Sequence, residues 1–154
     1  MKQNPSEKAL RENLEAGKLA KEGFLGDDSR PVDEIIATDL AELAAMNISQ
    51  EQLAARMREL TKKGLEGMGG PIDFGGFTLV VEDYMGWMGC PFRDYRRAAK
   101  RITRATAAKG GQQMQWSDMS IHLIEAHGFF QGLGSPYRLE PVALADFLGL
   151  TRPL

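Results

Sequence analysis

Cysteine and histidine are scarce in this chain of 154 residues, which contains one cysteine, Cys90, and two histidines, His122 and His127. A single cysteine excludes an intramolecular disulfide and a zinc site built from cysteine alone, and it agrees with a reducing compartment. Long apolar runs are also missing, since no stretch approaches the roughly 18 residues of a membrane-spanning helix. The N-terminus lacks the apolar core of a signal peptide. These absences predict a cytoplasmic protein without a membrane segment.

The sequence also lacks the common catalytic and nucleotide-binding motifs. It contains no Walker loop, no GxGxxG, no HExxH and no hydrolase nucleophile elbow. With 43% hydrophobic and 26% charged residues and a formal net charge of -2, the composition is that of an ordinary globular protein with one core. We therefore expect a single domain over residues 1–154, with loose tails at 1–4 and 151–154, and we favour a non-enzymatic function.

The first part of the chain, residues 5–67, has helical periodicity. Apolar residues recur at spacings of three and four over residues 5–21 and 32–46, which predicts two amphipathic helices. A third helix begins after Ser49, because Gln52 follows three residues later in the spacing of a capping box. The two-to-three-residue connection before Ser49 makes the second and third helices neighbours.

Residues 47–67, NISQEQLAARMRELTKKGLEG, resemble the turn and recognition helix of winged helix-turn-helix DNA-binding proteins, and residues 71–82 could form the wing. The resemblance implies a DNA-binding regulator. Glu42 and Leu43 depart from the family's pattern in the preceding helix. The outer face of the third helix is nearly neutral, which disfavours phosphate binding. We therefore assign no base-contacting residues and keep DNA binding as a second alternative. That outer face comprises Gln50, Glu51, Ala55, Arg56 and Glu59.

From residue 67 the chain becomes rich in glycine, and residues 77–84 are rich in β-branched and aromatic residues, which favours a strand. The pair Gly75-Gly76 predicts a tight turn back to residues 72–74. A second turn at residues 109–111 predicts a hairpin between residues 102–107 and 112–116. Between these hairpins we expect an irregular apolar loop at 86–92, with Cys90 either buried and inert or activated by a nearby cation.

Two helices complete the predicted fold. Ser117 can cap a helix that ends at Gly128, and Pro141 begins a last helix that ends at Gly149. The predicted fold class is therefore α+β, with a helical N-terminal half, a small antiparallel sheet over about residues 72–116 and two C-terminal helices.

Positive charge is concentrated in residues 93–104, which contain five arginines, one lysine and one aspartate. Such a run forms either a solvated edge or a surface for nucleic acid, phosphate or an acidic partner. The glycine-rich turn at 132–136, which precedes Arg138, could cradle an anion with its backbone N–H groups. The leading hypothesis is that the protein binds a protein partner, including a second copy of itself, or a small anionic ligand. The candidate ligand-binding residues are Arg93, Arg97, Ser135 and Arg138.

The alternative hypothesis is a metal-binding protein or a metal-dependent enzyme. On a helix over residues 118–127, Asp118, His122 and Glu125 share one face and could supply oxygen and nitrogen ligands to a divalent metal. At about 100° per residue, His127 falls on the opposite, apolar face and is expected to be structural. If the loop at 86–92 folds over this helix, Cys90 could join His122 in a mixed zinc site.

Overall fold

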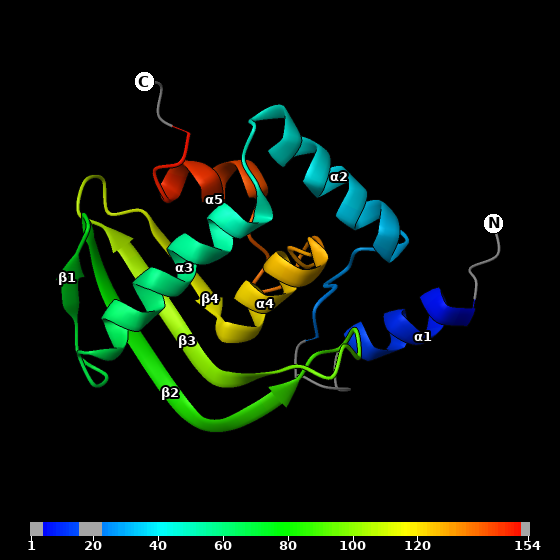
Figure 1. Ribbon diagram of the computed structural model, residues 1–154, viewed down its shortest axis with the longest axis horizontal. Coiled ribbons are helices and arrows are strands. Elements are labelled where there is room, and N and C mark those ends of the chain that lie inside the picture. The colour runs from blue at the N-terminus through cyan, green and yellow to red at the C-terminus, as the bar shows by residue number, and fades with distance from the viewer. Residues whose placement is uncertain (1–4, 16–22, 152–154) are drawn as a thin grey trace.

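The computed structural model describes residues 5–15 and 23–151 and has an α+β fold, as the sequence predicts (Figure 1). Helices α1, α2 and α3 precede a four-stranded sheet, and α4 and α5 follow it. The predicted end of the first helix, beyond residue 15, lies outside the described residues, as do residues 1–4 and 152–154. The elements are α1 (Pro5–Leu14), α2 (Val32–Ala45), α3 (Gln50–Leu65), β1 (Ile72–Phe74), β2 (Phe77–Gly89), β3 (Arg97–Ala107), β4 (Gln113–Ser117), α4 (Asp118–His127) and α5 (Pro141–Phe147).

The sheet is an antiparallel meander in the order β1-β2-β3-β4. Both predicted hairpins are confirmed: Phe74 pairs with Phe77 across the Gly75-Gly76 turn, and Thr106 pairs with Gln113 across the second turn. Both turns place glycines at positive φ, where a side chain would be strained. The hairpin turns therefore fix the register of the sheet.

The predicted loop at residues 86–92 is partly wrong, because β2 continues to Gly89 and pairs there with Arg97. A bulge between Asp83 and Trp87 interrupts the pairing with β3, and a bulge increases strand bending and twist. Beyond it β2 and β3 curve away from the sheet toward α1 (Figure 1). We call this paired extension, residues 84–89 and 97–100, the arm. The turn between these two strands covers residues 90–96, and β3 begins at Arg97.

Helix α3 lies across one face of the sheet (Figure 1), and a buried polar contact joins it to two strands. The indole nitrogen of Trp116 donates to Oγ1 of Thr61 at 3.0 Å, and Thr61 Oγ1 lies 2.6 Å from Thr103 Oγ1. Trp116 and Thr103 are completely buried, and the main apolar core of α3, α5 and the sheet surrounds them. Because β4 leads directly into α4, this contact also fixes the position of the first turn of α4 relative to the sheet.

A second apolar cluster joins α1, the start of α2 and α4 to the end of the arm. It contains Leu14, Phe24, Val32, Leu123 and Phe129, together with the side chain of Cys90. The cluster holds the loop after β2 against α4. Of the two alternatives for Cys90, the structure shows the buried one, since the residue is 6% exposed.

The turn between α2 and α3 begins the segment that resembles a winged helix-turn-helix, and its first residue has a positive φ. Asn47 has a φ of 57°, and Ser49 and Gln52 form the predicted capping box. Gln50, however, donates to the carbonyl of Ile124 at 2.9 Å, and Arg56 pairs with Glu59. Three of the five side chains on the nearly neutral face are thus engaged within the protein, and DNA binding by α3 stays a prediction. No helix among the described residues is long and apolar enough to cross a membrane.

The segment after α4 packs closely on residues 24–28. The amide of Gly132 donates to the carbonyl of Phe24 at 2.8 Å, and Leu133 N–H donates to Oδ2 of Asp28 at 3.1 Å. A Cβ at position 132 would lie 2.2 Å from the carbonyl oxygen of Leu25. Only glycine therefore permits this approach of two backbones.

We expect Gly132→Ala to lower the free energy of unfolding by about 1–3 kcal/mol, because the methyl group must displace backbone. Gly89→Ala is the matched control, since no atom beyond its chain neighbours lies within 4 Å of where the added methyl group would stand, and its φ is not positive. This control should change stability by no more than about 0.5 kcal/mol. Urea unfolding, monitored by circular dichroism, measures the free energy of unfolding of both variants. Equal stability of the two variants would contradict this account of the packing.

Candidate metal centre

Helix α4 carries both histidines and has well-defined ends. Ser117 accepts a hydrogen bond from the amide of Ser120, and Gly128 ends the helix in the left-handed conformation. Both caps agree with the sequence prediction. The helix therefore contains His122 in its middle turn and His127 as its last residue.

The loop at residues 90–96 connects the two strands of the arm and crosses α4. It is closed by a hydrogen bond from the amide of Cys90 to the carbonyl of Arg96 at 2.9 Å. Arg93 and Tyr95 both have positive φ, an uncommon conformation for side chains of their size. Between them, Asp94 accepts a hydrogen bond from the Arg96 amide on Oδ1, at 2.9 Å. The second carboxylate oxygen is thereby left to face α4.

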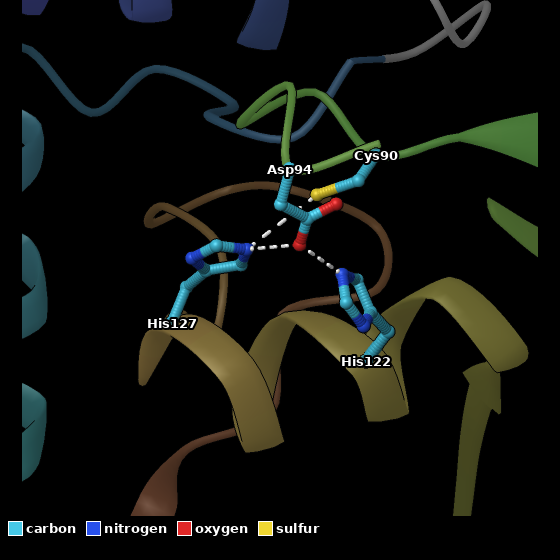
Figure 2. Close-up of side chains that lie close together, drawn as sticks. All are labelled: Cys90, Asp94, His122 and His127. Carbon is cyan, nitrogen blue, oxygen red and sulfur yellow. Dashed lines mark hydrogen bonds and ion pairs between the residues drawn. The ribbon is translucent and has the colours of Figure 1, made fainter. Parts of the chain in front are cut away.

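Four side chains converge where this loop meets α4 (Figure 2). Oδ2 of Asp94 lies 2.7 Å from Nε2 of His122 and 2.8 Å from Nε2 of His127. Sγ of Cys90 lies 3.6 Å from Nε2 of His127. One ligand atom from each of the four residues falls within 4.8 Å of all the others. We call Cys90, Asp94, His122 and His127 the loop–helix cluster.

The expectation that the two histidines point in opposite directions is wrong. Five residues along a helix separate their Cα atoms by about 140° around the axis. The loop carrying Asp94 crosses between these directions, and each imidazole is long enough to turn its Nε2 toward the carboxylate (Figure 2). Phe92 stacks on the ring of His127, with centroids 4.1 Å apart and planes 8° from parallel. His127 is therefore oriented by the loop rather than buried in the main core.

The other two predicted metal ligands have different partners. Asp118 faces Arg101, with 3.1 Å between Nε and Oδ2, and Glu125 accepts two hydrogen bonds from Arg58 at 3.0 and 3.2 Å. Burial raises the pKa of Asp118, whereas hydrogen bonds from Arg58 lower the pKa of Glu125. Asp118, His122 and Glu125 are therefore not brought together in one group.

Charge is distributed unevenly within the loop–helix cluster. Burial acts to raise the pKa of Asp94, but hydrogen bonds from the Arg96 amide and from both imidazoles outweigh it and hold the pKa well below its usual range. Burial raises the pKa of Cys90 to about 11. Without a bound cation, the cluster thus contains an ionised carboxylate and a protonated thiol. A cation would favour the thiolate, because metal coordination deprotonates thiols.

The arrangement does not form a cysteine–histidine–aspartate nucleophile relay. Such a relay needs the sulfur at one imidazole nitrogen and the carboxylate at the other. Here Nε2 of His127 faces both Cys90 and Asp94. The two ring nitrogens, the carboxylate oxygen and the sulfur are instead four potential metal-ligand atoms that lie close together.

Asp94 is not among the candidate metal ligands predicted from the sequence, where it counts only as one charge within residues 93–104. A signal is present: Cys90 and Asp94 are four residues apart, and His122 and His127 are five apart. Two short-spaced pairs of potential ligands, one beside a proline and one on a helix, resemble the paired spacing of mixed metal sites. The contact between the pairs depends on tertiary structure and has no local signal.

The four predicted anion-binding residues do not face one space. Arg138 pairs with Asp39 at 2.9 Å and with Glu140, and Ser135 donates to Gln131 at 2.6 Å. Ion pairing with these two carboxylates raises the pKa of Arg138 despite its burial. Arg97 instead lies over the ring of Trp87, and Arg93 contacts Asn13. Binding of a partner or a small anion stays a prediction.

Comparison of the chain with protein-family models, with curated proteins and with solved structures found no match.

The ion pair of Arg138 and Asp39 supports a stability prediction, since the two side chains are 7% and 2% exposed. Arg138→Gln should lower the free energy of unfolding by about 3–5 kcal/mol, because it leaves a buried carboxylate without its partner. Arg104→Gln, which removes a half-exposed pair with Glu82, should cost no more than about 1 kcal/mol. Chemical unfolding measures the free energy of unfolding of each variant. Equal losses of stability in the two variants would contradict a buried structural role for Arg138.

Proposed function

We propose that this protein binds a zinc ion or a similar divalent transition metal through Cys90, Asp94, His122 and His127. The observation that carries the proposal is the approach of two Nε2 atoms to the same oxygen of Asp94, at 2.7 and 2.8 Å, with a thiol 3.6 Å from one of them. Burial supports it, because the cysteine is 6% exposed and the other three side chains are between 16% and 23% exposed.

The chemistry of the donors favours zinc over magnesium or calcium. Thiolate and imidazole are ligands for zinc and neighbouring transition metals, whereas magnesium and calcium take oxygen ligands. From typical bond lengths, a tetrahedral zinc ion separates nitrogen and oxygen ligands by roughly 3.3 Å and sulfur and nitrogen ligands by roughly 3.6 Å. The sulfur–nitrogen distance already matches. The carboxylate and imidazoles would move apart by about half an ångström.

Four protein ligands complete a tetrahedral coordination shell and leave no position for substrate, as in structural zinc sites. Cys90 and Asp94 belong to the loop, and His122 and His127 belong to α4. A metal ion would thus cross-link the end of the arm to the helix. The function that we infer is structural, with metal binding stabilising this junction.

The test compares metal binding by variants of the loop–helix cluster with metal binding by variants of Asp118 and Glu125, the ligands predicted from the sequence alone. Wild-type protein, stripped with chelator and reloaded, should bind one zinc per chain and melt at a higher temperature when loaded, since a ligand that binds only the folded state stabilises it. Asp94→Asn and His127→Gln should each lose at least about tenfold in zinc affinity. Asp118→Asn and Glu125→Gln, the matched controls, should retain zinc affinity within about twofold.

Cobalt substitution gives an independent measurement. Cobalt bound to Cys90 should show the visible bands of tetrahedral coordination and a thiolate charge-transfer band in the near ultraviolet, and Cys90→Ser should remove the latter. Because Cys90 is the only thiol in the chain, zinc should also protect the protein from thiol reagents. A loss of zinc in Asp118→Asn but not in Asp94→Asn, or zinc affinity no higher than magnesium affinity, would contradict the proposal.

A further inference from the structure

The arm and the loop at its end contain most of the exposed large apolar side chains among the described residues. Seven large apolar residues are substantially exposed among the described residues, and four of them lie between positions 84 and 95. These are Tyr84, Met85, Trp87 and Tyr95, with exposures of 57%, 78%, 57% and 103%. The other three, Met68, Leu133 and Val142, lie far apart in the sequence. An exposed gathering of this kind on a folded protein indicates a binding surface.

Cations lie among these side chains. The guanidinium carbon of Arg97 is 4.9 Å from the centre of the Trp87 ring, and the stem of Lys100 lies beside Gly86, with Cδ 3.9 Å from where a Cβ would stand. Among the residues that the structure describes, Arg96, Arg97 and Lys100 form no ion pair, in contrast to Arg101 and Arg104 on the same strand. The arm therefore presents available positive charge.

Of the two nearby carboxylates, Glu82 has its charge compensated by an ion pair, whereas Asp83 is only hydrogen-bonded and keeps its charge. Glu82 pairs with Arg104 and accepts a hydrogen bond from the Tyr84 hydroxyl. Asp83 accepts a hydrogen bond from the amide of Met85 within the bulge. The three cations that form no ion pair among the described residues outnumber this one carboxylate, so the local charge is positive on a chain whose formal net charge is -2, and an anionic partner would be attracted to the arm.

We propose that the arm binds single-stranded nucleic acid through Trp87, Arg97 and Lys100. A single strand offers a phosphate and a stackable ring at every nucleotide, which matches a surface where rings alternate with cations. The stacked pair of Trp87 and Arg97 presents two planar groups on which bases can stack. A membrane would favour a continuous apolar wedge instead, whereas here cations lie among the apolar side chains, with Arg97 over Trp87 and the stem of Lys100 beside Gly86. This proposal does not depend on metal binding.

The experiment uses the full chain and a fluorescein-labelled oligothymidylate of about 20 nucleotides, which exceeds the site size of typical single-strand-binding folds. Anisotropy should give a dissociation constant in the micromolar range at low ionic strength, weakening as salt is added. Trp87→Ala should weaken binding at least about fivefold, because a stacking ring is lost. Arg97→Gln with Lys100→Gln should lower the slope of log affinity against log salt by about 1.4, the effect of two charges on a single strand.

Control variants test whether binding depends on the arm or on exposed positive charge anywhere on the protein. Lys62 and Lys109 are exposed and lie outside the arm, so Lys62→Gln with Lys109→Gln should leave the salt slope within about 0.3 of wild type. Met68→Ala is the control for loss of an exposed apolar side chain, and circular dichroism verifies that each variant folds. The proposal is overturned by absence of oligonucleotide binding at low ionic strength or by unchanged affinity of Trp87→Ala. Equal affinity for duplex DNA, or binding to vesicles containing phosphatidylserine without binding to the oligonucleotide, overturns it as well.

Discussion

The hydrogen bond from the Trp116 indole to Thr61 is the contact on which the arrangement of this protein depends. It lies in the main core, where an unpaired indole N–H or hydroxyl would carry a desolvation penalty of about 1–3 kcal/mol, and Thr103 completes it from β3. One polar contact thus holds α3, β3 and β4 together. Since Ser117 follows Trp116 and caps α4, the same contact determines where the helix carrying both histidines starts.

The second constraint is the bulge in β2. An unbroken hairpin would continue in the plane of the sheet, whereas the bulge between Asp83 and Trp87 redirects β2 and β3 and brings their connecting loop over α4. Hydrogen bonding within this loop then holds one oxygen of Asp94 and turns the other to the histidines. The same bend exposes the outer side of the arm with Trp87 and Arg97. Both proposed sites therefore follow from one irregularity in strand pairing.

Local signals in the sequence predicted most of the fold. The caps at Ser49 and Ser117 and the glycine pairs at 75–76 and 110–111 act over a few residues, so their structural effect can be read without knowledge of the rest of the chain. The candidate site could not be predicted in the same way. Helical geometry assigned Asp118, His122 and Glu125 to one face, but ion pairs with Arg101 and Arg58 engage the two acids. Asp94 was missed because only the bulge and the loop bring it to α4.

Hydrogen bonding alone can also hold the loop–helix cluster together. If each imidazole carried a proton on Nε2, Asp94 could accept from both, and the loop would be held without a metal. That arrangement leaves the Cys90 thiol beside a nitrogen whose proton is already directed at the carboxylate. The thiol then has the Asp94 carboxylate as its hydrogen-bond partner. A metal ion at the proposed site would instead replace the proton on each imidazole, bind the carboxylate and convert the thiol to a thiolate ligand. The two arrangements therefore differ chiefly in the state of the sulfur, which is a hydrogen-bonded thiol in the first and would be a metal-bound thiolate in the second.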